Sequence, residues 1–130
     1  MSDPTEVRRA SQDDQFFWDA AAERRLVIQR CADCGTLRHP PAPMCGSCGS
    51  LRWDAAESSG RGRIVSWISS QHPNRPDEEP RIVILVQLEE GTRLVSNLLD
   101  APAGPYDDLP VAVEFRDDRG TLTPFFRVQS

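Results

Sequence analysis

The apolar residues of the chain follow a helical period near its beginning and a strand period in its second half. The helical spacing runs through Phe16, Phe17, Ala20 and Ala21. Ser11 followed by Asp14 suits a capped helix start, and Arg25 suits the negative end of the helix dipole. The pattern therefore predicts one helix over residues 12–25.

A short apolar segment, residues 26–30, predicts a strand directly after this helix. Further strand-like segments begin after Gly60 and cover residues 63–69, 81–88, 92–98, 111–116 and 121–128. No helical period lies between them, and the proline-rich connections 70–80 and 99–110 exclude long helices there. Five strands without intervening helices predict a small barrel of the OB type.

Four cysteines lie between the first strand and the barrel segments, as two Cys-x-x-Cys pairs separated by ten residues: Cys31, Cys34, Cys45 and Cys48. Two such pairs supply the four soft sulfur ligands that a tetrahedral zinc ion needs. Gly35 and Gly49 follow the pairs and permit the turns that aim backbone N–H groups at sulfur. The apolar content around the cysteines is too small to fold this piece alone, so a bound metal is expected to stabilise it.

Other uses of the four cysteines are less consistent with the sequence. A rubredoxin-type iron site uses the same four sulfurs, so the spacing leaves iron open beside zinc. Disulfides are unusual in the cytoplasm, where we expect this chain because its beginning is polar and no segment is apolar enough to span a membrane. His39 lies between the pairs and is interpreted as a loop residue, since four sulfurs complete the shell and make the zinc structural.

Composition and charge narrow the function classes. The chain has 130 residues, 27% of them charged, with a formal net charge of -5. All its cationic side chains are arginines, and residues 52–130 hold 9 Arg against 13 Asp plus Glu. That balance disfavours nonspecific binding to nucleic-acid phosphates. The only histidines, His39 and His72, accompany no nucleophile or phosphate-binding motif, so we expect no independent catalysis.

In the order of its motifs the chain resembles the zinc-ribbon and OB-fold proteins that accompany thiolases and acyl-CoA hydratases, long catalogued as a domain of unknown function. The matching stretches are residues 17–21, 26–35, 41–45, 60–62, 94–98 and 124–127. The resemblance implies an acyl-CoA-associated accessory subunit with a thiolase-like or hydratase partner, and it implies that the four cysteines bind zinc. Gly46 and Leu109 depart from the common pattern without removing a ligand.

Together these observations predict a mainly β protein with an N-terminal helix, a rubredoxin-like zinc ribbon and a five-stranded OB-fold barrel. We divide it into a tail (1–11), the helix (12–25), the ribbon (26–53) and the OB domain (54–130).

Two surface sites are expected besides the cysteines. Phe16, Phe17 and Trp18 are consecutive on the helix and cannot all face one narrow stripe. They either cover the protein's own core or form part of a docking site for a partner protein. Coenzyme A carries a diphosphate and a ribose phosphate, and the candidate contacts for these phosphates, if CoA binds this subunit, are Arg61, Arg63 and Arg93.

The alternative function is binding of single-stranded nucleic acid, because zinc ribbons and OB folds also serve that role. It requires a cationic groove with stacking aromatic residues. The acidic barrel segment offers only Trp67, Tyr106 and the terminal phenylalanines.

Overall fold

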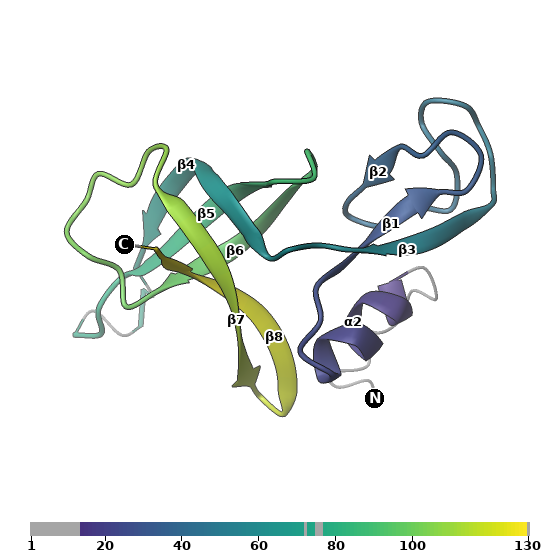
Figure 1. Ribbon diagram of the computed structural model, residues 1–130. Helices are drawn as coiled ribbons and strands as arrows, with labels where there is room; N and C mark the ends of the chain where they lie inside the picture. The colour runs from purple at the N-terminus through teal and green to yellow at the C-terminus, as the bar shows by residue number, and fades with distance from the viewer. Residues whose placement is uncertain (1–13, 72, 75–76, 130) are drawn as a thin grey trace.

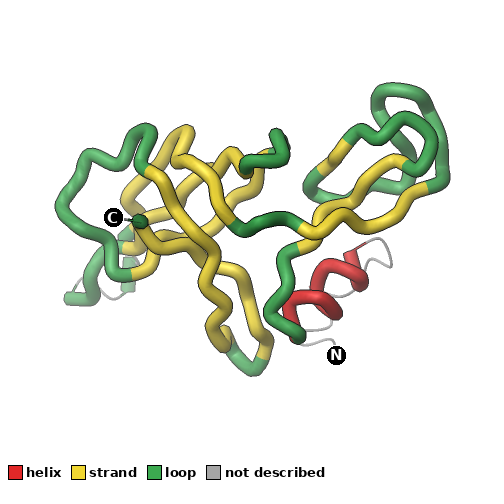
Figure 2. Tube along the Cα trace, in the orientation of Figure 1, coloured by secondary structure: helices red, strands yellow, loops and turns green. Residues whose placement is uncertain are grey.

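The computed structural model describes residues 14–71, 73–74 and 77–129. Figure 1 shows a short helix beside a small sheet, and a barrel built from the second half of the chain. The elements are α2 (Gln15–Ala22), β1 (Val27–Cys31), β2 (Leu37–Arg38), β3 (Trp53–Glu57), β4 (Arg61–Ser70), β5 (Arg81–Leu88), β6 (Arg93–Leu99), β7 (Pro110–Asp118) and β8 (Thr121–Val128). Strands and loops make up most of the described chain (Figure 2), which confirms the mainly β fold.

The barrel is closed by five strands in the order β4-β5-β6-β8-β7, with β4 pairing back to β7. All pairs are antiparallel except β6 with β8, which run parallel where Leu98 faces Phe126. The five predicted strands are confirmed, with ends that differ by at most two residues. Val65 is an extra residue in β4, since the pairing with β5 shifts between Ile64 and Ser66; such a bulge bends the strand and strengthens its twist.

The second sheet has the order β2-β1-β3 and carries the cysteines. Strand β3, which pairs with β1 from Val27↔Glu57 to Cys31↔Trp53, was not predicted. Its alanines and acids are poor strand formers, but pairing with the buried β1 overrides that local preference. The boundary predicted between Trp53 and Asp54 falls inside this strand.

The helix is shorter than the predicted 12–25. It begins after Asp14, and residues 11–13 of the expected cap lie outside the described part of the chain. It ends at Ala22 because Arg24 adopts a left-handed backbone with φ 60°. The amides of Arg25 and Arg24 then bond to the carbonyls of Ala20 and Ala21, closing the end as a Schellman motif does.

One hydrophobic core joins the helix, β1 and the barrel. Phe17, Leu26 and Ile28 belong to the same buried cluster as Ile64 and Phe126 of the barrel. No helix among the described residues is long and apolar enough to cross a membrane. The two halves of the fold therefore pack as one body.

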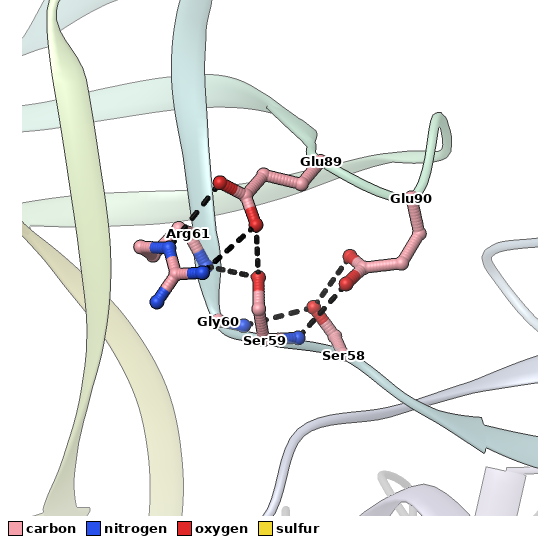
Figure 3. Close-up of polar contacts among 6 residues, drawn as sticks. All are labelled: Ser58, Ser59, Gly60, Arg61, Glu89 and Glu90. Carbon is pink, nitrogen blue, oxygen red and sulfur yellow. Dashed lines mark hydrogen bonds and ion pairs between the residues drawn. The ribbon is translucent and has the colours of Figure 1, made fainter.

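The linker from β3 to β4, residues 58–60, is held by the turn between β5 and β6 (Figure 3). The Ser58 hydroxyl and the Ser59 amide donate to the Glu90 carboxylate, at 2.8 and 2.9 Å. The Ser59 hydroxyl donates to Glu89 at 2.8 Å. These hydrogen bonds hold the linker against the barrel.

Candidate metal centre

The four cysteine sulfurs lie together at one end of the ribbon sheet, all within 4.8 Å of one another. The Sγ atoms of Cys31 and Cys48 are 3.6 Å apart, as are those of Cys34 and Cys45. A tetrahedral zinc ion with Zn–S bonds of about 2.3 Å places its sulfurs about 3.8 Å apart. All four thiols are free of disulfides. The residues present therefore fit a zinc ion.

The two Cys-x-x-Cys segments form matching turns. In the first, the Cys31 amide donates to the Thr36 carbonyl at 2.9 Å, and the Gly35 amide donates to the Cys31 carbonyl at 3.0 Å. In the second, Cys45 bonds to Ser50 and Gly49 bonds to Cys45 in the same way, both at 2.9 Å. Both glycines have positive φ, 80° at Gly35 and 76° at Gly49, a conformation that side chains rarely adopt.

Backbone amides also point at the sulfurs, as in metal-binding knuckles. The Cys34 amide lies 3.4 Å from the Cys31 sulfur, and this hydrogen bond is the main cause that lowers the pKa of Cys31 to about 6. The Ser50 amide lowers the pKa of Cys48, but the neighbouring sulfurs outweigh it and raise that pKa to about 12. Four thiolates this close need a cation to balance their charge, which a zinc ion supplies.

The segment between the two turns is anchored by a cross-strand pair, Gln29 on β1 and Arg38 on β2. Gln29 is fully buried and accepts the Ala42 amide at 2.8 Å, while Arg38 donates to the Ala42 carbonyl at 3.1 Å. Gln29 could not be singled out from its sequence context, because a glutamine beside a cysteine motif is usually a surface residue. This pair fixes the path between Cys34 and Cys45.

His39 lies away from the sulfurs. Its ring packs against Phe17 with the centroids 5.2 Å apart, and burial lowers its pKa. Within the described residues, the cluster able to hold a metal contains the four cysteines without His39.

The aromatic residues of the helix all contact the protein itself. Phe17 is buried in the core, and Phe16 and Trp18 are half-buried against it. The Phe16 ring lies 4.8 Å from Trp53, and the Phe17 ring lies 5.1 Å from Trp18 in an edge-on arrangement. Docking of a partner at these rings stays a prediction, and it is restricted to the exposed margins of Phe16 and Trp18.

The three candidate arginines are brought together on the outer face of the barrel. Gln87 of β5 faces Arg63 on β4 and Arg93 on β6 in register, so these three side chains share one face. Arg61 and Arg63 line a groove of about 580 Å³ between β4, β5 and the start of β7.

The arginines differ in their partners. Arg61 forms an ion pair with Glu89, with Nε and Oε2 3.2 Å apart (Figure 3). Arg63 donates to the Asp108 carbonyl at 2.8 Å, and Arg93 donates to the Gln87 side chain at 3.2 Å. Arg63 and Arg93 therefore keep cationic charge that no carboxylate within the described contacts neutralises.

Three of the aromatic residues that a nucleic-acid site would use, Trp67, Tyr106 and Phe126, belong to the barrel core or pack against it. Tyr106 is buried, its hydroxyl donates to the Pro102 carbonyl at 2.6 Å, and Trp67 packs edge-on against it at 4.8 Å. Phe126 is fully buried. Tyr106 and Phe126 thus belong to the barrel core and Trp67 packs against it, whereas Phe125 is half-buried.

Two family models match the chain in succession. The ChsH2 rubredoxin-like zinc ribbon domain matches residues 18–54, and the ChsH2 C-terminal OB-fold domain matches residues 55–116.

Two curated relatives are hydratase subunits. The chain is 48% identical over 120 residues to a probable enoyl-CoA hydratase alpha subunit of Thermomonospora curvata, covering 90% of this chain and 38% of the relative. It is 39% identical over 119 residues to the 3-oxo-4,17-pregnadiene-20-carboxyl-CoA hydratase alpha subunit of Mycobacterium tuberculosis, covering 88% of this chain and 38% of the relative. The chain thus spans under two-fifths of the length of either relative.

A solved structure matches over nearly its whole chain. It is described as an Ltp2-ChsH2(DUF35) aldolase, and one of its chains superposes with a TM-score of 0.82 and 47% identity, covering 91% of this chain and 95% of that chain. The predicted order of zinc ribbon and OB fold is confirmed, and the chain belongs to the ChsH2-type, or DUF35, family of zinc-ribbon and OB-fold proteins.

Proposed function

We propose that this chain is a non-catalytic accessory subunit of an acyl-CoA-processing enzyme and binds a thiolase-like aldolase or an acyl-CoA hydratase. The observation that carries the proposal is the 47% identity to a chain solved in an Ltp2-ChsH2 aldolase, over 95% of that chain. The hydratase subunits among its relatives support the same acyl-CoA context. In this proposal the catalytic groups belong to the partner.

The metal has a structural role in this proposal. Cys31, Cys34, Cys45 and Cys48 complete a tetrahedral shell, which leaves no open position for a reacting water. A zinc ion bound there would stabilise the ribbon, because the segment from β2 to β3 contributes few buried apolar side chains. Bound there, the ion would keep the paired strands β1 and β3 of the ribbon in place.

We also assign the phosphates of CoA to Arg61 and Arg63, which line the groove, and to Arg93 beside it. Arg63 and Arg93 flank Gln87 on one face, which suits the separated phosphate groups of CoA. Arg61 is already paired with Glu89, so we expect it to contribute less.

Affinity capture tests the accessory role. The tagged chain is purified from its native cells, and the proteins that accompany it are identified by mass spectrometry and tested for coelution on size exclusion. We expect a thiolase-like aldolase or a hydratase in near-stoichiometric amount. A chain that elutes alone in native extract contradicts the proposal.

CoA binding is tested on the captured complex by calorimetry. We expect Arg63→Gln and Arg93→Gln to weaken CoA binding about tenfold each, since each removes a cationic contact. Arg119→Gln, at the exposed turn between β7 and β8, is the matched control. Equal CoA affinities for all three variants and the unaltered complex would show that CoA does not bind at Arg63 and Arg93.

A further inference from the structure

The outer face of strands β4, β5 and β6 concentrates exposed apolar side chains. Among the described residues, five large hydrophobic side chains are exposed, and three of them, Val65, Ile68 and Val95, lie on these strands. Ile68 is 62% exposed and Val95 is 68% exposed. Isolated exposed apolar residues need no explanation, but a group of them on one sheet face does.

The pairing register places these side chains on one surface. Ile68 faces Val83, and Leu85 faces Val95, so all four project from the same side of the sheet. The opposite side carries Ile84 and Val86, which are buried in the barrel. We call the outward set Ile68, Val83, Leu85 and Val95 the apolar face.

The shape of the apolar face suits a protein better than a small molecule. Its hollow is about 270 Å³, and the residues that line it within the described part of the chain all belong to the three strands. Small ligands need concave sites that bury most of their surface. An open face with apolar residues at its centre matches the core of a protein interface.

The charges around the apolar face differ between its two ends. The next outward residue of β5 after Leu85 is Gln87, which faces Arg63 on β4 and Arg93 on β6. This end of the apolar face is therefore cationic. At the other end, Arg81 of β5 lies on the same outward side and faces Ser70, and the connection between β4 and β5 holds the exposed acids Asp77, Glu78 and Glu79. A complementary partner therefore presents acidic groups beside Arg63 and Arg93, and both acidic and basic groups at the other end, where Arg81 lies near the acids.

We infer that the apolar face is the surface on which the partner enzyme docks, with an apolar patch of the partner at its centre and opposite charges at its rims. The inference rests on the proposed function and goes further by naming the surface. A second copy of this chain fits less well, because each copy has a formal net charge of -5 and the two would repel. The groove lined by Arg61 and Arg63 then lies at the edge of the interface.

The experiment compares three variants of the full chain for binding to a separately purified Ltp2-type aldolase of the same organism, by biolayer interferometry. Ile68→Glu and Val95→Glu place a charge in the apolar face, and we expect each to weaken binding at least tenfold. Leu51→Glu is the matched control, since Leu51 is 70% exposed and lies in the ribbon. Circular dichroism and thermal unfolding confirm that all three variants fold.

The outcomes separate the two proposals. Tenfold or greater losses for Ile68→Glu and Val95→Glu with an unchanged Leu51→Glu support the docking surface. If Ile68→Glu and Val95→Glu both bind as tightly as the unaltered chain, or if they lose no more affinity than Leu51→Glu, the apolar face is not the docking surface. The proposed accessory role is unaffected by either result. No binding by the unaltered chain overturns the docking surface and the aldolase as partner, while the accessory role then depends on whether affinity capture yields a hydratase. Dimers of the unaltered chain in sedimentation, abolished by Val95→Glu, overturn the choice of partner in favour of a second copy.

Discussion

Gly60 lies so close to Val113 that a side chain at position 60 has no room. A Cβ atom there would clash with the Cγ1 atom of Val113, and the Gly60 backbone has φ +80°. The Gly60 carbonyl also accepts the Val113 amide at 2.7 Å. The chain therefore enters the barrel at a point where only glycine fits.

We expect Gly60→Ala to lower the free energy of unfolding by about 2–4 kcal/mol, because the strained backbone and the clash with Val113 add together. Urea denaturation measures the loss. Gly91→Ala is the control, since Gly91 also has positive φ, +102°, but has open space around it. Equal losses in the two variants would show that the contact with Val113 is unimportant.

Cys45→Ser should abolish stable metal binding. Cys45 is buried and its sulfur lies 3.6 Å from that of Cys34, so the substitution removes one of the four sulfur ligands at a buried position. We expect the unaltered chain to hold one zinc ion by elemental analysis. The variant should hold little zinc and lose amide-exchange protection in β1 and β3. Ser47→Ala, in the same turn, should keep the metal, and a variant Cys45→Ser with full zinc content would refute this arrangement.

Stability should fall in acid through Glu114. The side chains of Arg127 and Arg116 donate to its carboxylate at 2.9 and 2.6 Å and hold its pKa at about 2. Because this pKa lies below the unfolded value of about 4.3, the stabilisation is present above that value and is lost as the pH falls toward 2.

The matched experiment compares the unaltered chain with Glu114→Gln in urea at several pH values. We expect the unaltered chain to be more stable near neutral pH and the difference to shrink between about pH 4.3 and pH 2. A difference that stays constant across this range would mean that Glu114 stabilises the barrel without its charge.

Glu90→Ala should loosen the linker between the ribbon and the barrel. The variant removes the acceptor of the Ser58 hydroxyl and the Ser59 amide. We expect a loss of about 1 kcal/mol in unfolding free energy and faster hydrogen exchange at Ser59. Glu79→Ala, an exposed acid in the β4–β5 connection, is the control. Unchanged exchange at Ser59 would argue against the role of Glu90.

The barrel could be predicted because its strands carry their own pattern. Residues 82–86 are apolar throughout, as a central strand is, and β7 alternates Val111, Val113 and Phe115 with polar side chains. The cysteine spacing likewise predicted that four sulfurs meet, because each pair closes a local turn.

What could not be predicted depends on contacts between distant residues. Strand β3 forms because β1 lies beside it, although its own residues do not favour a strand. The acids Glu89 and Glu90 accept hydrogen bonds from linker serines some thirty residues earlier, a pairing that only the folded barrel brings about. The row of Arg63 and Arg93 likewise exists only in the paired register of three strands.

The pinned linker also makes the chain a rigid spacer. Only residues 58–60 separate β3 from β4, and both serines among them are held by carboxylates of the barrel. Any protein seated on the barrel would therefore find the cysteine turns, which point away from the barrel in Figure 1, at one fixed distance and direction. The position of the ribbon relative to the barrel is therefore already fixed in the free chain, before a partner binds.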